Sequence, residues 1–349
     1  MTQTPRKTDR VPVLIASWLD QRHVDQIAAV ELERIDVLYA PDLLPVPRYE
    51  ADHYAPGRTL SDADLARWRS LVARAEVSFD FDWDRPSELL TNAPNLRWVQ
   101  SPSSGIGPML ERIGVMGSRL IVTNAAGIHA QPLAEFVVMA ALYFAKEMPR
   151  LNGWKASRHW ERFCGYELAG SRMLLVGLGG AGARVAKLSA ALGIEVLGHR
   201  RSKAPPPEGV ARLVTAAEID AELPHVDYLA LIAPDTAETR NMFDRRRLAL
   251  LPPRAVVINI GRGTLLDEPA LIEMLAKGQL RGAALDVFAK EPLPVDNPLW
   301  SMPNVIVSPH SASTVVQEND RIVDLFIENL RRYLDGRPLV NLFDHARKY

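Results

Sequence analysis

The sequence has little of what marks several large protein classes. Cys164 is the only cysteine in 349 residues, so no disulfide can form within the chain, and the reducing cytoplasm is the expected compartment. The 41 lysine and arginine residues nearly balance 42 aspartate and glutamate residues. This balance argues against a nucleic-acid surface, for which a basic excess is typical. The apolar run 11–16 is too short to span a membrane, so no membrane partner is expected.

The N-terminus lacks the features of a secretory signal. Residues 1–10, MTQTPRKTDR, carry charges with no apolar segment behind them, and a short disordered tail is expected instead. Repeats and low-complexity tracts are also missing, and no metal-binding motif is identified. The length and the ordinary hydrophobic content of 47% fit two globular domains.

Short apolar runs separated by helical patterns predict an α/β fold with strands buried in sheets. The expected strands in the first part are 11–17, 35–40, 96–101 and 119–124. Those in the second part are the run ending at Val176, then 194–198, 226–232, 255–260, 282–287 and 304–308. Apolar residues at helical spacing predict helices over 132–148 and 316–334, with Pro149 ending the first of them. The proline-rich segment 41–60 is expected to be a surface loop.

A glycine pattern opens the second series of strands. Gly177, Gly179 and Gly182 form G-x-G-x-x-G between an apolar strand and a helical pattern. The first glycine permits a tight turn, the second lets a pyrophosphate approach the backbone, and the third lets the helix pack closely on the strand. The helix N-terminus then attracts the anion. This strand-turn-helix context predicts a dinucleotide-binding site.

The type of dinucleotide is indicated at the end of the next strand. Enzymes that use NAD usually place an acid there to hold the ribose 2′-hydroxyl group. In this chain the strand runs into His199, Arg200, Arg201, Ser202 and Lys203, without a carboxylate. Guanidinium groups can hold a 2′-phosphate through paired, charge-assisted hydrogen bonds. NADP(H) is therefore favoured over NAD(H), although a solvated basic loop without a ligand remains the alternative.

Three motifs follow in order: N-x-x-R-G in 257–271, D-V-F-x-x-E-P in 282–294, and a Pro-His pair in 303–314. With the glycine pattern upstream, the chain closely resembles the D-isomer-specific 2-hydroxyacid dehydrogenases over residues 96–335. The resemblance implies a Rossmann-type nucleotide-binding domain inserted into a flavodoxin-like α/β substrate domain. The implied boundaries are 125–310 for the inserted domain and 1–124 with 311–349 for the other, with hinges near 124–131 and 308–315. It also implies a homodimer, to which the helix from Pro132 would contribute.

The resemblance implies a catalytic role for three residues. Arg262 would bind the substrate carboxylate and the reacting oxygen, because its planar fork stays charged and can hold two oxygens. His310 would protonate the ketone oxygen as hydride arrives, and imidazole suits this because its ordinary pKa lies near working pH. Glu291 would hydrogen-bond His310 and favour its protonated form. Asp286 would contact the nicotinamide carboxamide or ribose. The hydride itself belongs to the cofactor.

The cofactor-binding residues that the motifs and the resemblance imply form a longer set. They are Gly177, Gly179, Gly180, Ala181, Gly182, Arg200, Arg201, Ser202, Ala233, Pro234, Ile260, Gly261 and Asp286. The substrate carboxylate is expected to meet backbone N–H groups in the loop SPSSGIGP (101–108), with Ser104 and Gly105 as candidates and Ile106 as a possible wall. Relatives commonly have aspartate where this chain has Gly107. Trp160, Trp300 and His129 receive no role.

The expected function is reduction of a small 2-keto acid, of the glyoxylate or hydroxypyruvate reductase type. A phosphoglycerate dehydrogenase remains an alternative, because forms without the added regulatory domain exist. Glu291 argues against a formate dehydrogenase, whose members generally carry glutamine at this position. A dinucleotide-sensing binding protein resembling a corepressor stays open as a different class, since such members can retain the catalytic residues.

Overall fold

The computed structural model describes residues 10–202 and 204–345, which divide into two units. Unit 1 comprises the chain up to residue 128 together with the chain from residue 315, and unit 2 comprises residues 129–314. The junctions expected from the sequence are 124/125 and 310/311. The tail expected at the N-terminus falls mainly on residues 1–9, which lie outside the described residues. Lys203 of the basic loop also lies outside them.

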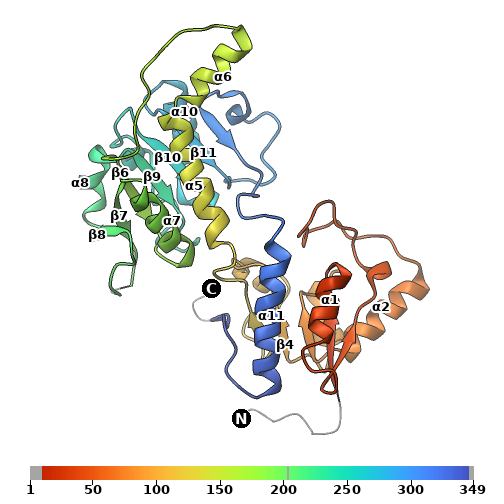
Figure 1. The fold of residues 1–349 in the computed structure, drawn as a ribbon. Coiled ribbons are helices and arrows are strands. Elements are labelled where there is room, and N and C mark those ends of the chain that lie inside the picture. Colours follow the sequence, from red (N-terminus) through yellow and green to blue (C-terminus); the bar gives the residue numbers. More distant parts are fainter. Residues whose placement is uncertain (1–9, 203, 346–349) are drawn as a thin grey trace. The chain divides into compact units, whose positions relative to one another are not determined.

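Unit 1, whose N-terminal part is red to orange in Figure 1, contains one parallel sheet with the strand order β2-β1-β3-β4-β5. Its strands are β1 (Val11–Ile15), β2 (Ile35–Leu38), β3 (Val77–Phe79), β4 (Trp98–Gln100) and β5 (Ile121–Thr123). Its α-helices are α1 (Gln21–Ala28), α2 (Asp62–Arg74), α3 (Leu89–Asn92), α4 (Gly107–Arg112) and α11 (Glu318–Leu334), and its 3₁₀ helices are Pro41–Leu43 and Pro86–Glu88. The order is that of flavodoxin-like sheets, with the topological switch point between β1 and β3.

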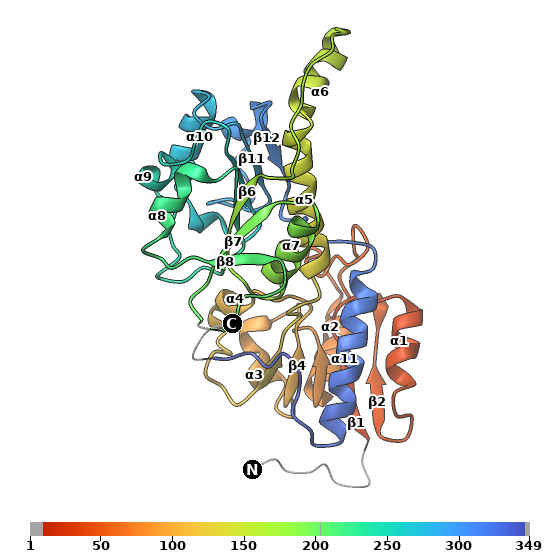
Figure 2. The same cartoon turned by 60° about the vertical axis from the view of Figure 1, so that its left-hand side comes forward.

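The C-terminal part of the chain completes unit 1. Helix α11 is amphipathic, as its periodicity predicts, and lies beside α1 (Figure 2). Its Phe326 ring packs 5.4 Å from Phe79 and 5.3 Å from Trp98, centroid to centroid. The buried Asn329 donates from Nδ2 to the Gln100 side chain at 3.1 Å and accepts from the Val340 N–H at 2.7 Å. These contacts join β4, α11 and the segment that follows α11 into one core.

Unit 2 is a seven-stranded parallel sheet with the order β12-β11-β10-β9-β6-β7-β8. Its strands are β6 (Arg172–Val176), β7 (Glu195–His199), β8 (Val210–Leu213), β9 (Tyr228–Leu231), β10 (Val256–Asn259), β11 (Gly282–Leu285) and β12 (Val305–Val307). Its α-helices are α5 (Ala130–Ala145), α6 (Met148–Ser157), α7 (Gly180–Ala191), α8 (Ile219–Glu222), α9 (Arg245–Leu248) and α10 (Glu268–Ala276). Short 3₁₀ helices cover Leu223–His225, Gly263–Leu265 and Pro298–Ser301. The chain reverses direction across the sheet between β6 and β9, which is the switch point of a Rossmann-type sheet.

Two sequence expectations about regular structure are corrected. The helix predicted over 132–148 is two helices, because Glu147 has a left-handed backbone (φ 57°) that ends α5, and Pro149 lies in the first turn of α6 instead of stopping a helix. The segment 41–60, expected as a plain surface loop, begins with a 3₁₀ helix and buries Leu43 and Leu44 in the core of unit 1. Among the described helices, none is long and apolar enough to cross a bilayer.

Candidate active site

The glycine loop of unit 2 lies at the switch point of its sheet. Gly177 follows β6 with φ +106°, and a Cβ atom there would come within 2.8 Å of the Ala233 backbone nitrogen after β9. A Cβ on Gly182 would overlap the carbonyl oxygen of Gly177. By contrast, apart from Gly179 itself and its two chain neighbours, nothing lies within 4 Å of the place that a Cβ of Gly179 would take, at the N-cap of α7. The loop is therefore closed toward the sheet and open at the helix N-terminus, which fits a pyrophosphate.

The other expected cofactor residues gather around this loop or follow neighbouring strands. Gly180 and Ala181 form the first turn of α7, and the segment from Ala233 to Pro234 follows β9. Ile260 follows β10 and is buried, with its N–H bonded to the Leu231 carbonyl at 3.0 Å. These residues share the carboxyl edge of the unit 2 sheet, where ligands of open α/β sheets bind.

The basic loop after β7 begins at His199. His199 lies at the end of β7, where its Nδ1 is 2.8 Å from the Val214 carbonyl. The guanidinium of Arg200 turns back and donates to the carbonyls of Ala204 and Pro205 within its own loop. Arg201 and Ser202 are exposed. The loop thus presents positive charge at the end of the strand where a ribose is held in this fold.

The three expected catalytic side chains all belong to unit 2, and two of them are in direct contact. Nδ1 of His310 lies 2.8 Å from Oε2 of Glu291, and Oε1 of Glu291 accepts from the Phe288 N–H at 3.0 Å. The hydrogen bond that His310 donates to Glu291 raises the pKa of His310, although burial opposes it. Burial acts to raise the pKa of Glu291, but the bonds from His310 and Phe288 lower it overall. The pair therefore favours an imidazolium beside a carboxylate.

Arg262 is held by the turn that follows β10. Asn259 accepts from the Gly261 N–H at 3.1 Å and donates to the Arg262 carbonyl at 2.9 Å. The guanidinium Nη1 donates to the Gly261 carbonyl at 2.7 Å. Its positive charge lowers the pKa of both Glu291 and His310, so the three groups interact electrostatically. A fixed guanidinium beside an acid-base pair is suited to bind a carboxylate at the reacting group.

Asp286, expected beside the nicotinamide, is 2% exposed and engaged with the loop that carries His310. Its Oδ1 accepts from the Ser308 hydroxyl at 2.5 Å, the Ser311 N–H at 2.8 Å and the Ala312 N–H at 2.9 Å. Its carbonyl accepts from the His310 N–H at 2.9 Å. These bonds fix the backbone of His310, which is left-handed (φ 56°).

Two side chains in this region were not identified from the sequence. Glu268, buried at the start of α10, accepts from the Ala289 N–H at 2.9 Å and from Asn297 at 3.3 Å, and so holds the loop that carries Glu291. Ser308 bonds Asp286 as described above. The only sequence signal for either residue was its position beside a motif.

The expected substrate loop lies in unit 1, after β4. Ser104 and Gly105 are exposed, whereas Ile106 is 2% exposed and packs into the core, so only the first two offer a surface to a ligand. Ile106 also takes the N-cap position of α4, and Gly107 is the first residue of that helix. Ser103 anchors the loop, because its Oγ lies 2.6 Å from the Tyr54 hydroxyl oxygen.

Three residues for which the sequence indicates no function, Trp160, Trp300 and His129, are exposed or lie at a junction between the units. Trp160 is 96% exposed and Trp300 is 54% exposed, so neither is a core residue of its own unit. His129 is the first residue of unit 2 and precedes α5. Within residues 10–202 and 204–345, no group of three or more His, Cys, Asp or Glu side chains is arranged to hold a metal ion.

Residues 138–312 match the family described as D-isomer specific 2-hydroxyacid dehydrogenase, NAD binding domain. A glyoxylate reductase of Aeropyrum pernix is 30% identical over 275 residues, which cover 73% of this chain and 78% of that protein. A D-3-phosphoglycerate dehydrogenase of Methanocaldococcus jannaschii is 33% identical over 228 residues, 64% of this chain and 43% of that protein.

A solved structure is similar to this chain over almost its whole length. The NADPH-dependent glyoxylate/hydroxypyruvate reductase of Sinorhizobium meliloti, in complex with NADP and sulfate, aligns with a TM-score of 0.75 and 26% identity, covering 97% of this chain and 100% of the other. The region matched by the family lies entirely within unit 2, which is therefore the part that binds the nicotinamide dinucleotide. With the glycine loop and the Arg262, Glu291 and His310 arrangement, these findings establish that the chain belongs to the D-isomer specific 2-hydroxyacid dehydrogenase family.

Proposed function

We propose that this protein reduces a small 2-keto acid to a 2-hydroxy acid, as a reductase of the glyoxylate or hydroxypyruvate type. The observation that carries the proposal is the 2.8 Å contact between His310 and Glu291 beside the guanidinium of Arg262. The pair holds a proton at the place where a general acid is needed, and the arginine supplies a fixed positive charge for an anionic substrate.

Each of the three residues has its own task. Arg262 binds the 2-keto acid through two oxygens and draws electron density away from the ketone. His310 donates the proton on its ring to the ketone oxygen, and Glu291 stabilises the imidazolium before that transfer. The bound cofactor supplies the hydride that the carbonyl carbon receives. In the oxidation direction, His310 accepts the proton of the alcohol instead. In unit 1, Ser104 and Gly105 are the candidates to bind the carboxylate through backbone N–H groups.

We infer that the cofactor is NADPH rather than NADH. The loop after β7 has no carboxylate to accept the ribose 2′-hydroxyl, and it presents Arg200, Arg201 and Ser202. A 2′-phosphate is favoured by guanidinium charge and would be repelled by an acid. The similar reductase of Sinorhizobium meliloti was crystallised with NADP, which supports the inference.

We also propose that two copies of the chain form a homodimer and that the protein works in the cytoplasm. Helix α5 leaves Met139 and Leu142 partly exposed, and Trp160 and Tyr166 are exposed after α6. Exposed apolar side chains gathered in one stretch of chain are typical of a protein interface. The single thiol, Cys164, is exposed, which suits a compartment that keeps thiols reduced.

The test is a substrate panel. Purified protein is mixed with NADPH or NADH and with glyoxylate, hydroxypyruvate, pyruvate, 3-phosphohydroxypyruvate or phenylpyruvate, and the loss of absorbance at the reduced nicotinamide band is followed. We expect turnover with glyoxylate and hydroxypyruvate, and faster turnover with NADPH. Tight NADPH binding without turnover of any acid would contradict the proposal and favour a dinucleotide-sensing binding protein.

A further inference from the structure

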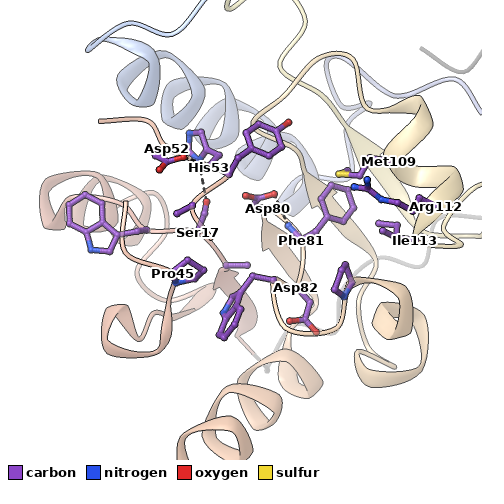
Figure 3. A pocket seen from close by; sticks show the side chains of 16 residues that line it. Ser17, Pro45, Asp52, His53, Asp80, Phe81, Asp82, Met109, Arg112 and Ile113 are labelled. Atoms are coloured by element: carbon purple, nitrogen blue, oxygen red, sulfur yellow. Dashed lines mark hydrogen bonds between the residues drawn. The ribbon is translucent and has the colours of Figure 1, made fainter. Parts of the chain in front are cut away.

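A cavity of about 210 Å³ lies within unit 1, at the carboxyl edge of its sheet. Figure 3 shows the side chains that line it, with the Asp80 carboxylate between Ser17 and His53 on one side and Phe81 on the other. Ser17 follows β1 and Asp80 follows β3, so the cavity opens at the topological switch point of this sheet. Ligands of open parallel sheets bind at this point. The volume is several times the ~30 Å³ that one water occupies in the liquid, so it accepts a small organic group.

The cavity combines aromatic walls with two carboxylates, Asp80 and Asp82, that form no ion pair among the described residues. Trp18, Phe81 and Trp83 provide apolar surface. Asp80 accepts from the Phe81 N–H at 2.8 Å and, among the described residues, forms no ion pair. Burial raises its pKa to about 7, against the hydrogen bonds from Phe81 and Ser17. A carboxylate in such a place is stabilised by a ligand that donates a hydrogen bond and is destabilised by a second anion.

Of the two neighbouring acids of the cavity, Asp52 is paired with a cation, whereas Asp82 accepts hydrogen bonds from neutral donors. Asp52 is bonded by Arg48, with Nε at 2.7 Å from Oδ2 and Nη2 at 3.1 Å from Oδ1. Asp82 accepts from the Trp68 indole at 2.8 Å and from the Asp84 N–H at 3.0 Å. Of the two acids without an ion pair, Asp80 is the one whose N–H is bonded to the end of β4, where the expected substrate loop begins, so we take Asp80 as the acceptor for a ligand.

The cavity also joins the expected substrate loop within the same unit. Tyr54 lines the cavity and its hydroxyl lies 2.6 Å from Ser103 Oγ, one residue before Ser104. The Asp80 N–H donates to the Gln100 carbonyl at 2.8 Å, at the end of β4 where that loop begins. A substrate held by its carboxylate at Ser104 and Gly105 can thus extend its other end along unit 1 toward Asp80.

We propose that this cavity is a specificity pocket for the far end of the 2-keto acid, in which Asp80 accepts a hydrogen bond from a substrate hydroxyl group. The proposal rests on the proposed function above. It names hydroxylated 2-keto acids of the hydroxypyruvate type as the preferred class. It also predicts that at pH 8, where Asp80 is ionised, 2-keto acids whose far end carries a carboxylate or a phosphate are rejected, because Asp80 would face a second negative charge.

The test compares Asp80→Asn with the wild type on four substrates. Asparagine tolerates the left-handed backbone of residue 80 (φ 69°) and keeps an oxygen for the Phe81 N–H while removing the charge. Hydroxypyruvate and pyruvate differ only in the hydroxyl group, oxaloacetate carries the anion, and glyoxylate has no carbon that could enter the pocket. Asp62→Asn, at the exposed start of α2, is the matched control, and thermal melting reports whether each variant is folded.

We expect kcat/KM of Asp80→Asn to fall about tenfold for hydroxypyruvate, the usual effect of losing a hydrogen bond to a charged group. The value for oxaloacetate should rise, and those for pyruvate and glyoxylate should stay close to the wild type. If Asp80→Asn leaves the ratio of kcat/KM for hydroxypyruvate to kcat/KM for pyruvate unchanged, or loses kcat/KM equally for glyoxylate, the proposed pocket is contradicted. The proposed reductase function would stand in either case. If the wild type does not reduce even glyoxylate, the proposed function itself fails, and the pocket with it.

Discussion

Glu291 holds the ring of His310 through a 2.8 Å contact between its Oε2 and the imidazole Nδ1, and this contact raises the pKa of the histidine. The raised pKa keeps the imidazolium, which is the proton donor in reduction, present to higher pH. In oxidation the neutral ring is the active form, so the same contact moves the rise of oxidation activity to higher pH. The contact therefore sets the pH at which the balance between the two directions changes.

Replacing Glu291 with glutamine should move this balance. The variant loses the charge that raises the pKa of His310, so the decline of kcat/KM for keto-acid reduction at high pH should shift to lower pH. The measurement is a pH profile from 5 to 9 with saturating cofactor. Glu273→Gln is the control, because the same change removes a carboxylate that pairs with Lys277 and Arg245 and not with His310. A profile of Glu291→Gln that coincides with the wild type would show that Glu291 does not tune the acid.

Replacing His310 with alanine removes the proposed general acid. Turnover should fall by about 10²- to 10⁴-fold, the range typical of a positioned acid, while the dissociation constant of the cofactor stays within about twofold. Nicotinamide fluorescence measures binding and absorbance measures turnover. Wild-type turnover in this variant would remove His310 from the mechanism.

Asp286 offers a choice between two roles that the kinetics can separate. If its task is to hold the loop 308–312, Asp286→Ala should lower kcat strongly with little change in cofactor binding, because His310 loses its fixed backbone. The alanine variant should also lower the pKa seen in the pH profile, since the charge of Asp286 raises the pKa of His310. Weaker cofactor binding with an unchanged profile would instead favour the contact to the nicotinamide expected from the sequence.

The basic loop after β7 can be tested by charge removal. Arg200→Ser with Arg201→Ser should lower kcat/KM for NADPH by at least about tenfold and leave that for NADH nearly unchanged, because paired charge-assisted bonds to a 2′-phosphate are lost. Arg245→Ser, which breaks an exposed ion pair with Glu273, is the control. A wild type that already prefers NADH would contradict the inference about this loop.

The raised pKa of Asp80 also has a consequence for stability. The unfolded carboxyl loses its proton near pH 4, whereas the folded one keeps it until about pH 7, so Asp80 destabilises the fold progressively between these values. Asp80→Asn should therefore melt at a higher temperature than the wild type at pH 8, with the gain vanishing below about pH 4.

That stability test must separate Asp80 from the titratable groups around it. Four other titratable groups line the same cavity: Asp52, His53, Asp82 and Arg112. All four are present in both the wild type and Asp80→Asn. The difference in melting temperature between the two proteins, measured at each pH, isolates residue 80. A difference that is constant from pH 4 to pH 8 would show that the Asp80 carboxyl does not titrate abnormally.

The sequence predicted the fold where strands are buried on both faces, because such strands are continuous apolar runs. β3 and β8 were not predicted, each for a different reason. In the first, Ser78 separates Val77 from Phe79 and Asp80 follows, so no continuous apolar run marks the strand. The second is an edge strand whose Ala211 and Arg212 are exposed. The break between α5 and α6 depends on the left-handed backbone of Glu147, which no local pattern indicates.

For the site, motifs located Arg262, Glu291 and His310, because each lies in a short segment whose spacing is itself characteristic. The residues that hold them were harder to find. Glu268 reaches the loop of Glu291 from a helix start about 20 residues earlier. Asp80 stands in the stretch F-D-F-D-W, where the sequence alone does not distinguish an acid facing a cavity from one that caps a turn. Such roles depend on tertiary contacts, which the local sequence does not specify.

The union of both chain ends in unit 1 has a consequence for the order of events during synthesis. Residues 10–128 are made first, yet the sheet they form needs α11 over Phe79 and Trp98, and Asn329 beside Gln100. The Phe343 N–H, bonded to the Val122 carbonyl, comes later still. Unit 2 is contiguous in sequence and can close as soon as residue 314 has emerged. Domains generally fold as units, so the nucleotide-binding unit should be complete while the other still exposes an apolar sheet face that awaits the end of the chain.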